Sequence, residues 1–354
     1  MWNETEVSRR LGIRYPIIQG PFGGGLSTVE LVAAVSNAGG LGSFGAHILS
    51  PAEILDLAAK IRKATGSPFA LNLWVSSVDP GGESMSAEDR ARSEEIFRPI
   101  YEELGIPLPG PYQSDDYSFE DQAAAVIEAQ PAAFSFVFGI PSAAILSECR
   151  RRGITTIGAA TTRAEARAIE SAGVDVVLAT GFEAGGHRPS FLRSAEESIM
   201  GTFALVPQVA DVVRIPVVAA GGIADARGIG AAFNLGAQAA QIGTAFLACE
   251  ESGANPVHRG QLHGHGDDFS TRLSRVITGR LARYIPNHVL RLIESRTSGP
   301  LPYPLQSWFT GPIRRYAANK HLVDYLAMYA SQATPLIKHR RAAELMTDLV
   351  AGMG

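Results

Sequence analysis

The chain has 354 residues, of which 46% are hydrophobic and 19% charged, which is the composition of an ordinary globular protein. Its 31 basic and 35 acidic residues give a formal net charge of −4, and they form no block of one sign. This balance argues against a nucleic-acid or membrane partner and favours a small ligand.

The first residues lack the pattern of a secretory signal, and no apolar stretch approaches the roughly 20 residues that span a bilayer. The two cysteines, Cys149 and Cys249, are far apart, and each stands in an apolar or helical segment. This usage predicts buried thiols in a reducing compartment, with neither cysteine suited to catalysis. We therefore expect a cytoplasmic protein.

Eight short apolar runs recur along the chain, and each is followed by glycine or a small polar turn and then by a helical pattern. The runs predict strands at residues 16–20, 40–45, 69–75, 132–139, 154–160, 175–181, 215–222 and 239–246. Helices are predicted between them at residues 28–39, 51–66, 142–153, 163–173 and 225–236. Ser, Thr, Asp or Pro stands near the helix starts and glycine at their ends, as helix caps require.

Strands that alternate with helices pair in parallel, and continuously apolar strands belong to a sheet that is covered by helices. Eight such units predict an α/β protein with a TIM (β/α)₈ barrel, and an open doubly wound sheet is the alternative. The glycines of residues 19–27 have the wrong spacing for a dinucleotide-binding fingerprint, and no phosphate-binding P-loop occurs.

Two segments exceed what a simple barrel needs. An insertion at about residues 76–118, between the third and fourth strands, carries a charged helix and a loop rich in proline and glycine. We expect it to sit over the mouth of the barrel. The tail from residue 276 to 354 is predicted to form helices without strands that pack on the barrel. The expected organisation is a barrel over residues 1–275 and a helical extension over residues 276–354.

Glycines follow the last two predicted strands. Gly221 and Gly222 end the seventh, and residues 241–244 (Gln241, Ile242, Gly243 and Thr244) end the eighth. Loops after these strands are the common phosphate site of a TIM barrel, because bare backbone lets N–H groups approach an anion closely. The alternative is that the glycines only fit tight turns. Their occurrence on two consecutive units favours phosphate.

A histidine follows the sixth predicted strand. Gly185 and Gly186 leave room for a flat ligand against the backbone, and His187 is placed to exchange a proton with it. A surface histidine without a role is the alternative, but the flanking glycines, Glu183 and the strand-end position favour a functional one.

Polar groups also mark the first and third strands. Asn72 lies in an otherwise apolar strand, where its amide either bonds to local backbone or contacts the edge of a heterocycle. Residues 19–21 (Gln19, Gly20 and Pro21) end the first strand and offer similar backbone groups. Together these features describe a phosphate at one side of the mouth, a planar heterocycle across it and an imidazole beside it, which is a description of bound FMN.

The chain resembles the nitronate monooxygenases of the 2-nitropropane dioxygenase-like flavoproteins. The similarity covers residues 16–46, 71–75, 136–141, 160–188, 215–229 and 236–252, and also the helical tail. It implies a TIM barrel that binds FMN non-covalently, with His187 as the active-site imidazole. It implies cofactor contacts at Gln19, Gly20, Pro21, Asn72, Thr180, Gly185, Gly186, Gly221, Gly222, Gln241, Ile242, Gly243 and Thr244.

The resemblance also suggests a function and its alternatives. It implies oxidation of small alkyl nitronates or nitroalkanes by O₂ to a carbonyl compound and nitrite, and a homodimer is compatible with it. One alternative is an NAD(P)H-dependent flavin reductase of quinones or enoyl thioesters. The other is a barrel that binds a phosphorylated metabolite without flavin.

Three positions qualify the resemblance. Thr180 stands where many relatives have glutamine, and Pro189 and Ser190 replace the usual glycine after the histidine. These differences bear on the cofactor contact at residue 180, on the path of the loop beside His187 and on substrate preference. Tyr303 resembles a family position near the substrate, although a loop tyrosine packed on the barrel is an equal alternative.

A cluster of histidines and aspartates follows the eighth strand, but no strand directs these side chains as a metal site requires. We therefore expect a solvated loop and no metal. The residues are His258, His263, His265, Asp267 and Asp268.

Overall fold

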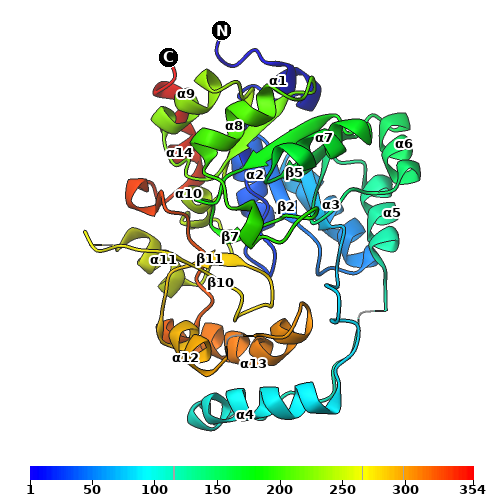
Figure 1. Cartoon of the computed structure of the whole chain (residues 1–354). Coiled ribbons are helices and arrows are strands. Elements are labelled where there is room, and N and C mark those ends of the chain that lie inside the picture. Colours follow the sequence, from blue (N-terminus) through cyan, green and yellow to red (C-terminus); the bar gives the residue numbers. More distant parts are fainter. Residues whose placement is uncertain (115, 265, 298) are drawn as a thin grey trace.

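The computed structural model describes residues 1–354 except 115, 265 and 298 (Figure 1). Eight parallel strands form one sheet, and each lies within a predicted strand. They are β1 (Ile17–Gln19), β2 (Gly42–Gly45), β3 (Phe69–Trp74), β4 (Ala133–Val137), β5 (Thr155–Ala160), β6 (Val176–Thr180), β8 (Val217–Ala220) and β9 (Ala239–Ile242).

The sheet closes into a barrel. Its hydrogen-bonded order is β1-β9-β8-β6-β5-β4-β3-β2, and a parallel bridge between Ile18 and Leu41 joins the two outer strands. The Gln19 N–H donates to the Leu41 carbonyl at 2.9 Å, and the Leu41 N–H donates to the Ile17 carbonyl at 2.9 Å. The TIM barrel prediction is confirmed, and the open-sheet alternative is wrong.

Helices surround the barrel, and all five predicted ones are present. Hydroxyl side chains begin most of them, as at Ser50, whose hydroxyl accepts from the Glu53 N–H while the Glu53 carboxylate accepts from the Ser50 N–H. The ring contains α2 (Val29–Asn37), α3 (Pro51–Ala64), α5 (Phe119–Ala129), α6 (Ala143–Arg151), α7 (Arg163–Ser171), α8 (Thr202–Ala210) and α9 (Ala226–Asn234).

The last helix of the chain completes this ring. α14 (Ala342–Ala351) packs against α2, α9 and the short α10 (Thr244–Leu247), where the helix after the eighth strand of a barrel belongs. Its Leu345, Met346 and Leu349 are buried in the main hydrophobic core. The barrel is therefore built from two stretches of chain that are distant in sequence.

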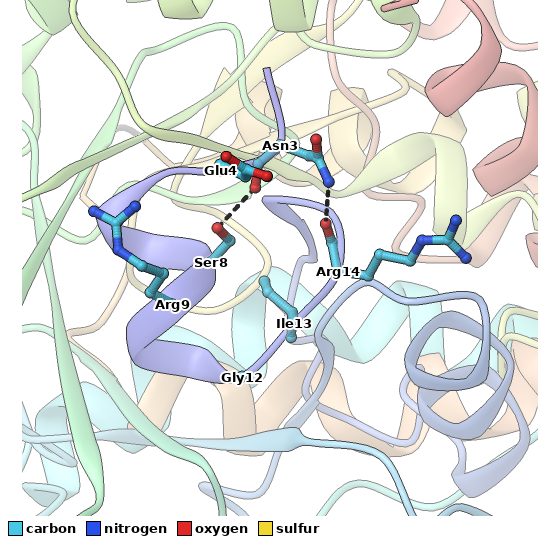
Figure 2. Close-up of a pocket in the computed structure, with 7 residues that line it drawn as sticks. All are labelled: Asn3, Glu4, Ser8, Arg9, Gly12, Ile13 and Arg14. Carbon is cyan, nitrogen blue, oxygen red and sulfur yellow. Dashed lines mark hydrogen bonds between the residues drawn. The ribbon is translucent and has the colours of Figure 1, made fainter. Parts of the chain in front are cut away.

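The N-terminal end of the barrel is closed by α1 (Glu6–Leu11), whose Val7 and Leu11 are buried against the strand interior. An open cavity of about 410 Å³ lies beside it and is lined by residues of α1 and the turn that follows (Figure 2). It is at the pole opposite to the carboxyl ends of the strands, where barrel chemistry is found.

The insertion and the tail build a second lobe together. α4 (Ala87–Leu104) packs against α12 (His288–Arg296) and α13 (Leu305–Lys320) at the lower end of the molecule in Figure 1. Phe97 stacks on Phe309, and the Tyr101 hydroxyl donates to the Phe309 carbonyl at 2.5 Å. The charged helix expected over the mouth is thus the outer layer of a lobe whose inner layer comes from the tail.

The tail also contains a strand, so the expectation of helices alone is wrong. β11 (Ala282–Tyr284) lies between β10 (Arg272–Ser274) and β7 (Gly186–His187) in a small antiparallel sheet. Residue 276, where the helical extension was expected to begin, lies inside the β10–β11 hairpin. Pairing with β7 gives this short segment an extended partner that its sequence does not reveal.

The histidine-rich segment is helical in its first half, so the expectation of a solvated loop is wrong there, whereas Gly264, Gly266, Asp267 and Asp268 lie in an exposed loop. Residues Pro256–His263 form α11, and His258 is buried with its Nε2 2.9 Å from the Tyr329 carbonyl oxygen. His265 lies outside the described residues, and Asp267 and Asp268 are exposed. Among the described residues no three His, Cys, Asp or Glu side chains gather in a way that would hold a metal.

Both thiols are buried and unpaired, as predicted. Burial raises the pKa of Cys149 to about 11 and that of Cys249 to about 12, which keeps both protonated. In the part of the chain that the structure describes, no helix combines the length and apolarity needed to cross a membrane.

Candidate active site

An aromatic cluster occupies the carboxyl ends of β2, β3 and β4. Trp74, the last residue of β3, is at its centre, and the His47 ring stacks on it with centroids 3.9 Å apart and planes within 3°. Phe138, His187 and Tyr303 contact the same indole at centroid distances of 4.8, 5.0 and 5.4 Å. The predicted imidazole and the predicted substrate tyrosine are thus brought together at the mouth of the barrel.

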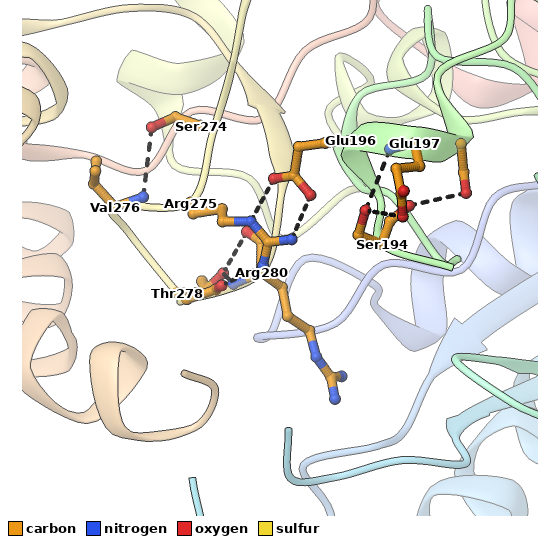
Figure 3. A network of polar contacts seen from close by, with 10 residues as sticks. Ser194, Glu196, Glu197, Ser274, Arg275, Val276, Thr278 and Arg280 are labelled. Carbon is orange, nitrogen blue, oxygen red and sulfur yellow. Dashed lines mark hydrogen bonds and ion pairs between the residues drawn. The ribbon is translucent and has the colours of Figure 1, made fainter. Parts of the chain in front are cut away.

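A buried arginine, Arg280, completes the cluster. It is 4% exposed and comes from the turn between β10 and β11. Its guanidinium carbon lies 4.1 Å from the ring centroid of Phe138, 4.5 Å from that of Tyr303 and 5.2 Å from that of Trp74. Figure 3 shows this side chain extending away from the neighbouring Arg275, which pairs with Glu196 at 2.5 Å.

The loop after β3 holds Arg280 in place. Its Nε and Nη2 both donate to one oxygen of Asp79, at 3.0 and 2.6 Å, and Nη2 also donates to the Ser76 carbonyl at 3.0 Å. The Asp79 N–H donates to the Tyr303 carbonyl at 2.9 Å. The arginine and the tyrosine are therefore anchored by the same residue.

The small sheet positions His187. Strand β7 pairs with β11, which places the imidazole beside the hairpin turn, and its Nε2 lies 2.9 Å from the Thr278 hydroxyl. Burial, followed by the charges of Arg280, His47 and Arg314, lowers the pKa of His187 from 6.5 to about 3. The pKa of His47 is also lowered to about 3, by burial and by Arg280. Both imidazoles are neutral near pH 7.

A second buried arginine binds the backbone of residues 180–181, at the start of the loop that carries His187 (the histidine loop). Arg188 is 1% exposed, and its Nη1 and Nη2 donate to the carbonyls of Gly181 and Thr180 at 2.6 and 2.7 Å. Burial lowers its pKa to about 10, so it remains charged. Thr180 is buried at the end of β6, where its carbonyl helps to fix the loop.

The loop after His187 follows a path set by a buried carboxylate. Glu165 is fully buried and accepts from the Thr161 N–H and hydroxyl at 2.7 Å, and from the Phe191 N–H at 2.7 Å. The Ser190 hydroxyl lies 2.8 Å from the Thr161 hydroxyl. Ser190, one of the two residues that replace the usual glycine after the histidine, is therefore part of this network.

Glu183 has a structural role rather than one at the imidazole. Its carboxylate accepts from the Thr202 N–H at 2.8 Å and from the Thr202 hydroxyl at 3.0 Å, at the first turn of α8. A carboxylate at this end of a helix satisfies free N–H groups and the helix dipole.

The predicted phosphate loops lie side by side. β8 pairs with β9 in the register Ala220 to Gln241, so the two loops leave neighbouring strands at the same end of the barrel. Gly221 and Gly222 have φ of +102° and +71°, a conformation that favours glycine. Among the described residues, the backbone N–H groups of Gly222, Ile223 and Gly243 donate to no other group of the chain. They form a set of available donors.

A strap from the tail, residues 329–332, crosses between the loops. The Ser331 N–H donates to the Thr244 hydroxyl at 3.0 Å, and the Gln332 N–H donates to the Glu183 carbonyl at 3.0 Å. Tyr329, at the start of the strap, contacts the His187 ring at a centroid distance of 5.7 Å. The tail thus joins the glycine loops to the histidine loop.

The predicted residues of β1 and β3 are mostly bonded to protein. The Gln19 amide oxygen accepts from the Ser43 N–H at 2.9 Å, and its Nε2 donates to the Gly20 carbonyl. The Asn72 Nδ2 donates to the Ser135 hydroxyl at 3.0 Å. The Gly20 N–H donates to the carbonyl of Ile242, so the loops after β1 and β9 are adjacent. Cofactor contacts at these positions and at Pro21 stay predictions.

Replacement of Gly185 by alanine is expected to destabilise the fold by about 1–3 kcal/mol, because the new methyl group has no space. A Cβ at this position would lie 2.7 Å from the Ala330 carbonyl carbon and 2.8 Å from the Ser331 nitrogen. Urea denaturation measures the loss. Gly186→Ala is the matched control: its Cβ meets no atom, so only the positive φ of +82° opposes it, by about 1–2 kcal/mol. Equal stability of Gly185→Ala and the parent protein would contradict the packing of the strap.

Several site residues were missed by sequence reasoning. His47 and Trp74 follow or end predicted strands, so their position was a usable signal. Thr278 and Arg280 come from the tail, where no predicted strand directs them to the barrel mouth. Only the β7–β11 pairing brings them to His187.

The sequence is similar to that of known proteins over almost its whole length. A family model described as nitronate monooxygenase matches residues 4–352. A probable nitronate monooxygenase from Staphylococcus haemolyticus (strain JCSC1435) is 39% identical over 352 residues, which are 99% of this chain and 97% of that protein. One from Staphylococcus aureus (strain Newman) is 36% identical over 354 residues, which are 99% of this chain and 97% of that protein.

Solved structures are also similar to this chain over almost its whole length. Nitroalkane oxidase from Streptomyces ansochromogenes is 34% identical, with a TM-score of 0.88 over 96% of each chain. FabK from Thermotoga maritima is 27% identical, with a TM-score of 0.76 over 99% of this chain and 96% of that one. The match over almost the whole chain, together with the histidine and glycine loops at one barrel mouth, shows that the chain belongs to the nitronate monooxygenase family of oxidoreductases.

Proposed function

We propose that the protein oxidises alkyl nitronates with FMN and O₂ to a carbonyl compound and nitrite. The observation that carries the proposal is the position of His187. This neutral imidazole contacts the aromatic cluster, and the tail strap that it touches through Tyr329 also bonds to Thr244, next to the free backbone donor of Gly243. Membership of the nitronate monooxygenase family supports the choice of reaction.

The residues at the mouth fit FMN. Free N–H groups of Gly222, Ile223 and Gly243 are the donors that a phosphate dianion requires, and the absence of side chains at the glycines lets the phosphate approach. The Thr244 hydroxyl is beside them. Gly186, whose Cβ side is open, would let the flat ring system lie near His187, whereas the expected room at Gly185 is filled by Ala330 and Ser331 of the strap. When bound, FMN supplies the redox chemistry, and the chain supplies binding and orientation.

His187 contributes a hydrogen bond rather than a charge. With a pKa of about 3 it is neutral at physiological pH, and such a weak base is poorly matched to removing a proton from a neutral nitroalkane. The site therefore suits a substrate that is already a nitronate. Thr278 fixes the imidazole through its Nε2, and the rings of Trp74 and Phe138 pack against it.

A visible spectrum of the purified protein, followed by oxygen consumption and nitrite release with propionate-3-nitronate, tests the proposal. We expect a yellow protein that releases FMN on denaturation and consumes oxygen without added nicotinamide. Colourless protein without releasable FMN would contradict it and favour a metabolite-binding barrel. Rapid anaerobic bleaching by NADH or NADPH, without nitronate turnover, would favour the flavin reductase instead.

A further inference from the structure

We propose that Arg280 is the anion-recognition group of this site and binds a planar oxyanion of the substrate through its Nη1. The identity of the substrate as a nitronate rests on the function proposed above. The binding of a planar oxyanion at Arg280 does not, because it follows from the arginine and its surroundings.

Arg280 has more hydrogen-bond donors than the protein uses. A guanidinium has five N–H groups, and Arg280 directs its Nε and Nη2 to Asp79 and Ser76. Its Nη1 is buried and has no hydrogen-bond partner among the described residues. A buried donor on a charged group is costly to leave unpaired, so an acceptor from outside the chain is the natural partner.

The surroundings of Arg280 are flat and aromatic. The guanidinium lies over the rings of Phe138, Tyr303 and Trp74, and Asp79 is the one carboxylate among the described residues that pairs with it. Phe138 keeps its place with φ of +62°, a left-handed conformation that is strained for a bulky residue and is typical of functional sites. Flat rings beside a planar, forked cation favour a planar oxyanion such as a nitronate or a carboxylate.

Charge at the mouth of the barrel is carried by arginine and not by histidine. Both His47 and His187 are neutral, and Arg280 is the charge that, after burial, contributes most to lowering the pKa of each. A guanidinium that is paired with Asp79 on one edge therefore lies beside the reaction site, where the imidazole carries no charge. Such a cation attracts an anionic substrate without needing a proton.

A purely structural role is the competing explanation, since Arg280 also joins the loop after β3 to the β10–β11 turn. The bonds to Asp79 and Ser76 account for that role completely. They leave Nη1 unused, and they hold the guanidinium so that little conformational freedom is lost when an anion binds.

Titration of the purified protein with sodium nitrate, followed by tryptophan fluorescence and calorimetry, tests the proposal without any turnover. Nitrate is a planar oxyanion that is not oxidised here. We expect Arg280→Met to weaken nitrate binding by about tenfold or more, and Arg280→Lys to give an intermediate loss because it keeps the charge but not the fork. Arg275→Met is the matched control, since Arg275 lies in the same turn and pairs with the partly exposed Glu196.

A double variant guards against misfolding. Arg280→Met leaves the Asp79 carboxylate unpaired, whereas Arg280→Met with Asp79→Asn removes both charges and is expected to show the same loss of nitrate binding. Asp79→Asn alone keeps an amide oxygen that can accept from the Arg280 Nε and Nη2, and it removes the carboxylate charge that competes with an anion, so this variant is expected to bind nitrate at least as tightly as the parent. If the arginine is only a clamp, Asp79→Asn loses as much as Arg280→Met, which would overturn the proposal. So would nitrate binding by Arg280→Met within twofold of the parent protein, or a parent protein that binds no nitrate.

Two substrates identify which oxyanion binds. If the nitronate group itself contacts Arg280, the variant raises KM for ethyl nitronate and for propionate-3-nitronate alike. If a carboxylate contacts it, only KM for propionate-3-nitronate rises. Unchanged KM for both would overturn the assignment to this substrate site. Failure of the proposed oxidation would show as absent turnover in the parent protein and would leave the nitrate result intact.

Discussion

Substitution of His187 by alanine is expected to leave the purified protein yellow and to lower kcat/KM for a nitronate roughly 100- to 1000-fold. The loss follows from removal of a preorganised hydrogen-bonding group beside the reacting atoms. The imidazole makes one hydrogen bond to protein, with Thr278, and rests against Trp74 and Tyr329, so the fold tolerates its removal better than that of a core residue. Nitrite release under initial-rate conditions measures the activity, and the visible spectrum measures retained flavin.

The control is His288→Ala, because His288 is exposed at the start of α12 and far from the barrel strands in sequence and fold. His187→Asn keeps a hydrogen-bonding side chain and should recover part of the lost activity. Turnover by His187→Ala at the parent rate would remove the imidazole from the mechanism.

Acidification below pH 6.5 is expected to destabilise the protein steeply. Three histidines are held neutral: the pKa is about 3 for His47 and His187 and about 4 for His258, and burial is the main cause in each case. In the unfolded chain each has a pKa near 6.5, so below that pH the unfolded state binds more protons than the folded one. Stability is then fully present above pH 6.5 and is lost as the pH falls toward 3 to 4, by up to about 1.4 kcal/mol per pH unit for each histidine.

Urea denaturation at pH 7, 6 and 5 measures this slope. His258→Gln provides the internal comparison: His258 is buried on α11 away from the mouth, and its removal should reduce the proton uptake on unfolding by about one. A free energy of unfolding that is level between pH 7 and 5 would show that these imidazoles are protonated in the folded protein.

The barrel was predictable because its signals are local. Each strand is a short apolar run, and each of the five predicted helices begins at a hydroxyl or carboxylate side chain and ends near glycine. Such patterns are visible within a short stretch of sequence and do not depend on residues elsewhere in the chain. The glycine loops were predictable for the same reason, since Gly221, Gly222 and Gly243 follow strands whose order in a barrel is fixed.

The remainder of the site depends on pairing between distant segments. The strand Ala282–Tyr284 is three residues long and has no period of its own, and it exists because residues 186–187 and 272–274 flank it. Arg280 and Thr278 reach His187 through that pairing. The alternation of apolar and polar residues does not predict such a contact. It indicates which face of a strand is buried, but not which segment of the chain packs on that face.

The role of Asn72 shows a different limit. A polar side chain in an apolar strand signals that it has a partner, and either the protein or a ligand satisfies that requirement. Here the Nδ2 group donates to Ser135 on the adjacent β4. The sequence indicated that a partner exists but not which one.

The position of α14 has a consequence for how the protein is made. A ribosome releases the eight strands long before it releases residues 342–351, yet these residues fill the gap between α2 and α9. Until then the nascent barrel exposes an apolar seam, and the strap that joins the glycine loops to the histidine loop has only just emerged. Acquisition of the native mouth is therefore a late event in biosynthesis, and it relies on contacts between the two ends of the chain, which form slowly.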